Sequence, residues 1–420
     1  MRVAVHTLGC KLNYAESSTI AREFARRGYE VVPSSSEADI YVVNTCSVTE
    51  HSDKKDRNLI RRLHRRSPGA LIAVVGCYAQ LRGEEISALD GVDIVLGARS
   101  KGLVVDEVER LLAAGGRGKA PQRVEICDID SVDNIFPAYS TGERTRAFLK
   151  IQDGCDYKCS YCTVPYARGG SRSLPTALLL EQAREIAASG IVEIVLTGVN
   201  TGDYGRKTGE SFLSLLQDLN AVEGIDRYRI SSIEPNLLTP EIVEWIASGT
   251  KFLPHFHIPL QSGCDRILSR MGRRYRTEDF RRKIELIRSH IDHVFFGIDV
   301  IVGFPGETEE DFRATYDFLE EIRPAFIHVF PYSRRRGTPA AGMPDQVPEH
   351  VKTSRVEILE EMCGRLHAEF CRENSGRTEE VLFESKSKDG KMAGYTRNYI
   401  KVEMPYDKAL IGKVVKVVLP

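Results

Sequence analysis

The sequence contains no apolar run long enough to cross a membrane. The run from Val294 to Val302 is one of the longest, yet Asp299 interrupts it and it falls well short of the ~20 residues that a membrane span needs. The first residues also lack an apolar signal core followed by a small-residue cleavage site. We therefore expect no membrane association and a cytoplasmic location, where thiols remain reduced.

The chain also lacks a sizeable net charge. Its 58 lysines and arginines are balanced by 59 aspartates and glutamates, which leaves a formal net charge of −1. This balance excludes a globally basic nucleic-acid-binding protein, but it permits a local basic face. The content of 42% hydrophobic, 28% charged and 8% aromatic residues is typical of a globular chain, and 420 residues correspond to about two to four domains.

The alternation of short β-branched runs and amphipathic stretches divides the chain into parts. Residues 1–112 predict an α/β domain with a parallel sheet. Residues 113–145 include a run rich in glycine, alanine and proline, which indicates a linker. Residues 146–375 hold six strand candidates separated by helices, which predicts a full or partial βα barrel that ends in a long charged helix. Residues 376–420 predict a small all-β module.

Ten cysteines in a reducing compartment favour metal ligands or redox chemistry over disulfides. The sharpest pattern is CxxxCxxC, formed by Cys155, Cys159 and Cys162 directly after the first strand of the second domain. Such a loop can ligate three irons of an iron–sulfur cube and leave the fourth iron open to a substrate or cofactor. The alternative is zinc, but structural zinc prefers four ligands in paired spacings, and no fourth Cys or His lies within about twenty residues.

Three other cysteines, Cys10, Cys46 and Cys77, form no short motif, but each of them follows a predicted strand. The carboxyl ends of neighbouring parallel strands border one crevice, so these thiols can converge. Any one of them alone is better explained as a small buried hydrophobe, whereas the three together favour a second metal centre or cluster. We interpret the remaining four cysteines as incidental: Cys127, Cys264, Cys363 and Cys371.

Other candidate site residues lie in loops that follow strands of the second domain. Gly198 and Gly303 permit close approach of the backbone to a bound small cofactor. Arg168 and Arg172 come soon after the cysteine loop, and we hypothesise that one of them binds a carboxylate or phosphate of the substrate. The alternative for both arginines is an ordinary surface position.

Basic residues gather at 54–66, 266–288 and 334–336. The tail from 377 to 420 has nine lysines and arginines against six aspartates and glutamates, interleaved with Tyr395 and Tyr399. Each run is equally well explained by a solvated helix face. Together they favour phosphate contacts, and the tail has the composition of a small RNA-binding β-module.

The motifs together resemble the radical S-adenosylmethionine (SAM) methylthiotransferase family. The cysteine loop, with Tyr161 before its last cysteine, is similar to the radical SAM signature, and the tail is similar to a TRAM domain. The surroundings of the other three cysteines resemble the N-terminal domain of the methylthiotransferases. The runs that carry these likenesses are Thr7-Leu-Gly-Cys-Lys-x-Asn13, Asn44-Thr-Cys46, Gly76-Cys77, Cys155–Cys162, Gly394-Tyr-Thr396 and Asn398-Tyr399.

This resemblance implies two [4Fe–4S] clusters, one on each set of three cysteines, together with SAM and an electron donor. The cluster on Cys155, Cys159 and Cys162 would bind and cleave SAM, and the resulting radical would take hydrogen from C2 of an adenine. The cluster on the other set would supply a sulfur that a second SAM methylates. Tyr161, Gly198 and Gly303 would lie at the SAM site.

Two departures from the family pattern affect the expected SAM contacts. Where the family has Gly-Gly-Glu after the second barrel strand, this chain has Thr197-Gly198-Val199. The pattern Gly-x-Ile-x-Gly-x-x-Glu appears with Asp299 at its first position and with Glu307 one place late.

The opening Thr-Leu-Gly-Cys-Lys-x-Asn and the run from Phe148 to Cys155 most resemble the branch that converts N6-threonylcarbamoyladenosine beside the tRNA anticodon to its 2-methylthio derivative. Sister branches act on isopentenyladenosine in tRNA or on an aspartate of a ribosomal protein. The alternative from another class is a non-catalytic, metal-dependent RNA-binding protein. The expected macromolecular partner is tRNA, and the sequence leaves the oligomeric state open.

Overall fold

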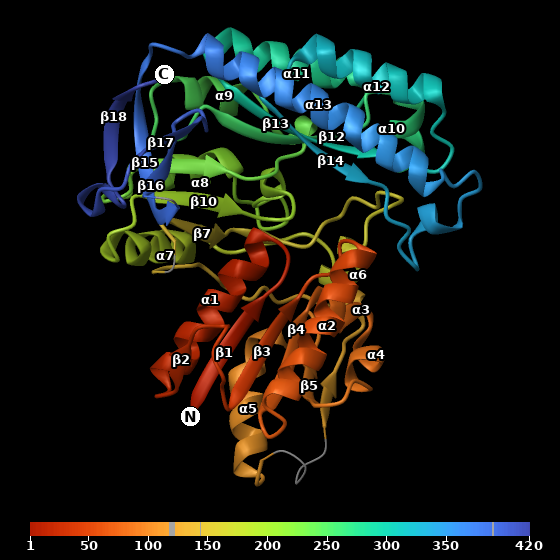
Figure 1. Cartoon of the computed structure of the whole chain (residues 1–420), viewed down its shortest axis with the longest axis vertical. Coiled ribbons are helices and arrows are strands. Elements are labelled where there is room, and N and C mark those ends of the chain that lie inside the picture. The colour runs from red at the N-terminus through yellow and green to blue at the C-terminus, as the bar shows by residue number, and fades with distance from the viewer. Residues whose placement is uncertain (117–121, 143, 389) are drawn as a thin grey trace.

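Figure 1 shows the computed structural model of the chain, which describes residues 1–116, 122–142, 144–388 and 390–420. An N-terminal α/β domain is followed by a central barrel-like domain and a C-terminal antiparallel β-domain. The fold class expected from the sequence is confirmed. No helix in these described ranges is long and apolar enough to span a membrane.

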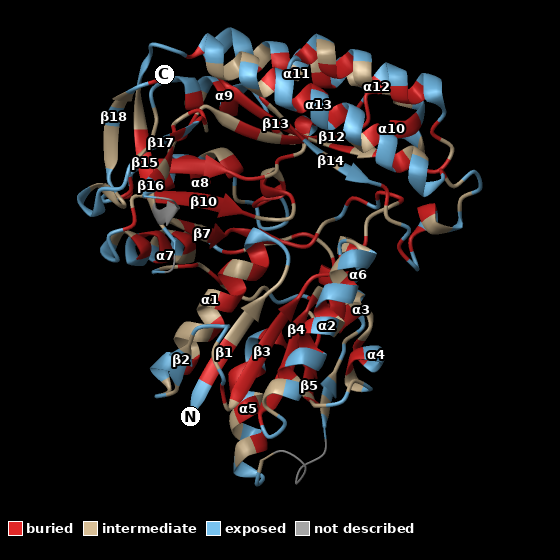
Figure 2. Ribbon diagram, viewed as in Figure 1, coloured by how far each residue is buried: buried red, intermediate tan, exposed pale blue. Residues whose placement is uncertain are grey.

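The N-terminal domain is built on one parallel sheet of six strands in the order β2-β1-β3-β4-β5-β6. Its central strands β3 and β4 are buried along their whole length, because helices cover both faces of the sheet. Figure 2 shows these strands in the colour of buried residues. The elements are β1 (Arg2–Thr7), α1 (Lys11–Arg26), β2 (Glu30–Val32), β3 (Ile40–Thr45), α2 (Glu50–Arg66), β4 (Leu71–Gly76), α3 (Cys77–Leu81), α4 (Gly83–Ser87), β5 (Val92–Leu96), α5 (Val104–Ala113) and β6 (Arg123–Glu125).

The segment expected to be a linker is partly built into this domain. Within residues 113–145, β6 pairs with β5 and so extends the sheet by one strand. The pattern does not reveal a strand of three residues, because so short a run shows no clear period. Residues 117–121 and 143 of the expected linker lie outside the described residues.

The central domain is a partial barrel of six parallel strands with helices on its outside. Its strands form two sheets, β11-β10-β7 and β12-β13-β14, which meet at a parallel bridge between Tyr228 and Phe252. Apolar residues of both sheets and of the surrounding helices form one continuous core. The elements are β7 (Arg146–Lys150), β8 (Gln152–Asp153), α6 (Val164–Arg168), β9 (Arg172–Ser173), α7 (Thr176–Ala188), β10 (Glu193–Thr197), α8 (Phe212–Asn220), β11 (Arg227–Ile230), α9 (Pro240–Ala247), β12 (His255–Gln261), α10 (Asp265–Met271), α11 (Thr277–His290), β13 (Phe295–Val302), α12 (Glu309–Ile322), β14 (Phe326–Pro331) and α13 (Glu349–Glu373).

The C-terminal domain is an antiparallel sheet of four strands in the order β17-β16-β15-β18. Arginines of the barrel hold it in place, since Arg227 and Arg229 donate to the backbone carbonyl of Thr396 at 3.0 and 2.9 Å. α13 runs along the barrel and leads into this domain (Figure 1). The strands are β15 (Thr378–Lys388), β16 (Lys391–Thr396), β17 (Lys401–Pro405) and β18 (Val414–Val418).

Candidate active site

The structure brings Cys10, Cys46 and Cys77 to one edge of the N-terminal sheet. They follow β1, β3 and β4, which are neighbours in the sheet and end in register, with Thr45 opposite Gly76. Burial, with smaller contributions from the thiols of Cys77 and Cys10, raises the pKa of Cys46 to about 12. The three cysteines thus share one edge of the sheet, at the ends of adjacent strands.

A glycine makes this convergence possible. Gly9 has a φ of +98°, which glycine adopts without strain, and a Cβ at this position would lie 2.5 Å from the Cβ of Cys46. No side chain therefore fits between the loop after β1 and the loop after β3. The geometry of the three thiols depends on this contact.

The loop with Cys155, Cys159 and Cys162 is a tight turn fixed by backbone hydrogen bonds. The N–H of Cys155 donates to the carbonyl of Gly169 at 3.0 Å, and a Cβ on Gly154 would lie 2.0 Å from the carbonyl oxygen of Gly170. Burial raises the pKa of Cys155 and of Cys162 to about 12, and neighbouring thiols of the loop add to both shifts. Metal binding at this loop therefore requires the release of thiol protons.

One buried cation contacts this loop, and the sequence analysis identified it only as part of the basic run at 266–288. The Arg273 side chain is only 3% exposed, and its Nη1 donates to the Sγ of Cys159 at 3.2 Å and to the Oη of Tyr161 at 3.4 Å. Its Nη2 pairs with Glu234. A guanidinium beside a thiolate stabilises the charged form of the sulfur, so Arg273 favours an anionic centre on these cysteines.

The two cysteine sets lie on either side of one domain interface. Thr163, which follows Cys162, donates from its Oγ1 to the carbonyl of Ser47, which follows Cys46, at 3.1 Å. The helix α3, which begins at Cys77, also packs against α6 of the barrel domain. Residues adjacent to both sets are thus in direct contact.

A buried ion cluster holds the same interface together, and we call it the interface ion cluster. Two carboxylates, Glu16 and Asp153, contact three cations, Lys101, Lys150 and Arg168, at distances from 2.6 to 3.3 Å. All five side chains are at most 6% exposed. Burial on its own would raise the pKa of Glu16, but Arg168 and the two lysines lower it well below its ordinary value.

Arg168 and Arg172, the two arginines hypothesised to bind substrate, have hydrogen-bond partners within the protein. Arg168 is buried and donates to Asp153 at 2.8 Å, to Glu16 at 3.1 Å and to the Oδ1 of Asn13 at 2.6 Å. Arg172 donates to the carbonyls of Gly170 and Arg168 at 2.6 and 2.7 Å. Both guanidinium groups are therefore engaged within the protein, and Arg168 acts as a bridge between the two domains.

A cavity of about 1500 Å³ extends from the edge of the N-terminal sheet into the barrel. Residues of all three domains line it, among them Cys10 and Gly198. Gly198 lies against Gln152, because a Cβ there would be 2.9 Å from the Gln152 Oε1. Gly303 is not among the lining residues and instead packs against Lys352 of α13, whose Cγ would lie 2.3 Å from an added Cβ.

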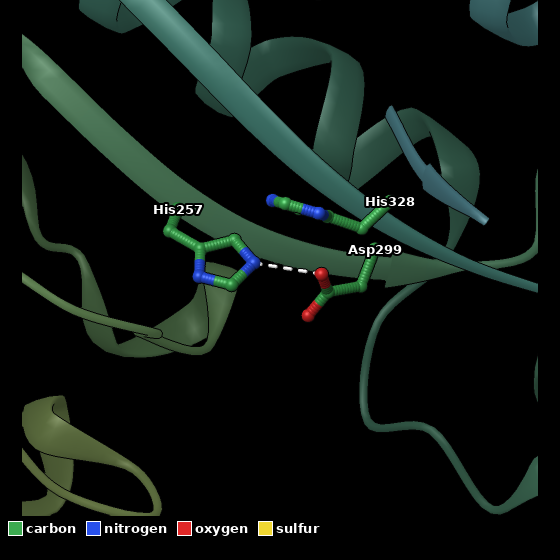
Figure 3. Close-up of side chains that lie close together, drawn as sticks. All are labelled: His257, Asp299 and His328. Carbon is green, nitrogen blue, oxygen red and sulfur yellow. Dashed lines mark hydrogen bonds and ion pairs between the residues drawn. The ribbon is translucent and has the colours of Figure 1, made fainter. Parts of the chain in front are cut away.

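Two histidines that the sequence did not single out lie close to Asp299 in the cavity lining, and the three residues are on β12, β13 and β14. The ligand-type atoms of His257, Asp299 and His328 all lie within 4.8 Å of one another (Figure 3). The Nε2 of His257 is 2.7 Å from the Oδ1 of Asp299, and its Nδ1 is 3.1 Å from the Oγ of Ser232. His257 is therefore held in place at both ring nitrogens, and the Asp299 carboxylate already has one hydrogen-bond partner.

Three family descriptions match successive parts of the chain. Residues 2–97 match the Uncharacterized protein family UPF0004, residues 149–319 match the Radical SAM superfamily, and residues 372–419 match the TRAM domain. Among solved structures, the radical S-adenosylmethionine methyltransferase TsrM from Kitasatospora setae aligns with a TM-score of 0.58 at 16% identity, over 93% of this chain and 80% of its own. That likeness shows a shared fold.

Curated relatives match along nearly the whole length. Threonylcarbamoyladenosine tRNA methylthiotransferase MtaB of Bacillus subtilis is 41% identical over 99% of this chain and 93% of its own, and MtaB of Aquifex aeolicus is 37% identical over the full length of both. The tRNA-2-methylthio-N(6)-dimethylallyladenosine synthase of Carboxydothermus hydrogenoformans is 35% identical over 98% of this chain and 94% of its own. The chain therefore belongs to the radical SAM methylthiotransferase family, whose radical SAM domain uses a [4Fe–4S] cluster and SAM.

Proposed function

We propose that this enzyme converts N6-threonylcarbamoyladenosine beside the tRNA anticodon to its 2-methylthio derivative. The relatives named for this activity are 37–41% identical to the chain, whereas those named for the dimethylallyladenosine reaction are 33–35% identical. The observation that supports the proposal is that residues adjacent to both cysteine sets are in contact at one domain interface, with Cys10 lining a large cavity.

The residues present fit two iron–sulfur clusters. Cys155, Cys159 and Cys162 would hold one, and Cys10, Cys46 and Cys77 would hold the second, each set leaving one iron without a protein ligand. When bound, these groups and SAM would supply the radical cleavage and the methylated sulfur. The chain itself contributes the enclosing cavity, the charge of Arg273 beside the first set and the contacts that fix the two sets relative to each other.

The proposed reaction involves two partners of the chain, an electron donor and tRNA. Reductive cleavage of SAM needs an electron donor outside the chain. The C-terminal domain, which matches the TRAM description and contributes Tyr395, Tyr399 and Lys401 to the cavity lining, would hold part of the tRNA. A tRNA substrate would place the reaction in the cytoplasm.

The proposal is tested anaerobically with cluster-reconstituted protein, SAM, a reductant and tRNA that already carries threonylcarbamoyladenosine. We expect digestion and mass spectrometry to show this nucleoside heavier by one CH₂S unit. If 5′-deoxyadenosine forms while the nucleoside stays unchanged, the substrate belongs to a sister branch. Iron-loaded protein that yields neither product would refute the enzymatic proposal.

The second cluster is tested by Gly9→Ala. The added Cβ would collide with Cys46 at 2.5 Å, so we expect iron to fall from about eight to about four atoms per chain and methylthiolation to be lost, with 5′-deoxyadenosine formation retained. Gly28→Ala is the matched control, because Gly28 also has a positive φ of +87° but no atom lies within 4 Å of an added Cβ. Iron content that is equal in the two variants would argue against a cluster at this edge.

A further inference from the structure

The cavity has a strong local charge although the chain is almost neutral. Among its lining residues in the described part of the chain are five lysines and arginines and one carboxylate, that of Asp299. The cations are Lys11, Arg144, Arg146, Arg229 and Lys401. A cavity of this composition favours an anionic ligand.

Most of these cations are already paired. Arg229 donates to Glu193 at 2.7 Å, Arg146 pairs with Glu384, and Lys401 pairs with Glu403. The guanidinium of Arg144 lies 4.5 Å above the ring of Tyr14. These contacts fix the first three cations within the protein and place the fourth on an aromatic face.

Lys11 differs from the others. It is the first residue of α1, it is exposed to the cavity, and no acceptor within the described residues lies at hydrogen-bonding distance from its ammonium group. It interacts electrostatically with Asp299 across the cavity, but that carboxylate is bonded to His257 at 2.7 Å (Figure 3). Within the described residues, Lys11 is therefore a cation without a hydrogen-bond or ion-pair partner, at the place where the cavity meets the cysteine edge.

Because Lys11 directly follows Cys10, its side chain would lie near the side of the adenine ring where sulfur is added. In adenine, C2 and C6 are both bonded to N1, so a substituent on N6 lies on the side of the ring where sulfur is added. Given the proposed function, the threonylcarbamoyl group on N6 would point toward the residues around Cys10. That group ends in a carboxylate, whereas the isopentenyl group of the sister substrate is neutral, and a buried carboxylate without a cation is strongly unfavourable.

We propose that Lys11 is the specificity-determining residue of this enzyme: its ammonium group pairs with the carboxylate of the threonylcarbamoyl substituent. A lysine ammonium is a compact charge with three donors, which suits a carboxylate at the end of a flexible substituent. This inference rests on the proposed function and goes beyond it, because it assigns the discrimination between acidic and neutral substituents to one side chain.

The test compares two anticodon stem-loops, one with threonylcarbamoyladenosine and one with its threoninamide counterpart, in which a carboxamide replaces the carboxylate. We expect Lys11→Gln to lower kcat/KM for methylthiolation of the acid by roughly 10- to 100-fold and to leave the rate with the amide unchanged. Lys11→Arg should restore most of the preference for the acid. Iron content and 5′-deoxyadenosine formation with SAM should match wild type.

Arg144→Gln is the matched control, since it removes another cation that lines the cavity and that stacks on Tyr14. It should lower kcat/KM for both stem-loops by a similar factor, as the loss of a phosphate contact would. The inference would be overturned if Lys11→Gln lowered kcat/KM equally for both stem-loops or for neither of them. A loss of SAM cleavage in this variant would also overturn it. A wild-type enzyme that modifies neither stem-loop would refute the proposed function and this inference with it.

Discussion

Replacing Cys162 by alanine is expected to reduce both 5′-deoxyadenosine formation and methylthiolation to background. The three cysteines of the barrel loop leave no spare ligand, and thiolate ligation cannot be replaced by a methyl group. We expect the variant to retain about half of the wild-type iron, held by the cysteines of the N-terminal sheet. Iron analysis, visible absorbance and product analysis after anaerobic reconstitution measure these effects.

The control is Cys371→Ala. Cys371 lies in the last turn of α13, where its Sγ is 3.8 Å from the Nε2 of His367, and it takes no part in either cysteine set. Its replacement should leave the iron content and both products unchanged. Full iron content and turnover with Cys162→Ala would contradict the assignment of the loop, and so would an equal loss in the control.

Glu16→Gln is expected to lower the free energy of unfolding by about 3–5 kcal/mol, because it leaves the cations of the interface ion cluster underpaired in a fully buried place. The Oε1 of Glu16 contacts Lys101, Lys150 and Arg168 at 2.6, 2.7 and 3.1 Å, and the Glu16 side chain is 1% exposed. Urea unfolding at neutral pH measures the change. Glu23→Gln, on the same helix but partly exposed and paired with Arg26 and Arg27 near the surface, should cost no more than about 1 kcal/mol.

The same cluster predicts a dependence of stability on pH. The pKa values of Glu16 and Asp153 are both lowered in the folded protein, since the three cations outweigh the effect of burial. A carboxyl group with a depressed pKa stabilises the fold above its unfolded pKa, and this contribution is lost as the pH falls toward the folded pKa. Wild-type stability should therefore decrease below about pH 4.5, with a smaller slope in Glu16→Gln. An identical slope would show that Glu16 does not titrate in this way.

The sequence by itself determined the family and the fold class. These features depend on local information: the spacing of Cys155, Cys159 and Cys162 within one loop, and the position of each other cysteine directly after a strand. Parallel strands and amphipathic helices show their period within a few residues, and the six strands predicted for residues 146–375 are present as the six parallel strands of the barrel.

The tertiary structure alone decided what the charged residues do. Arg168 looked like a surface arginine or a substrate ligand, but its partners Asn13 and Glu16 lie 155 and 152 residues away in the sequence. His257 and Asp299 likewise meet only because β12 and β13 pair in the barrel. The periodicity of a sequence does not reveal the partner of a charged side chain. The role of such a side chain depends on its burial and on the opposite charges that the fold places beside it.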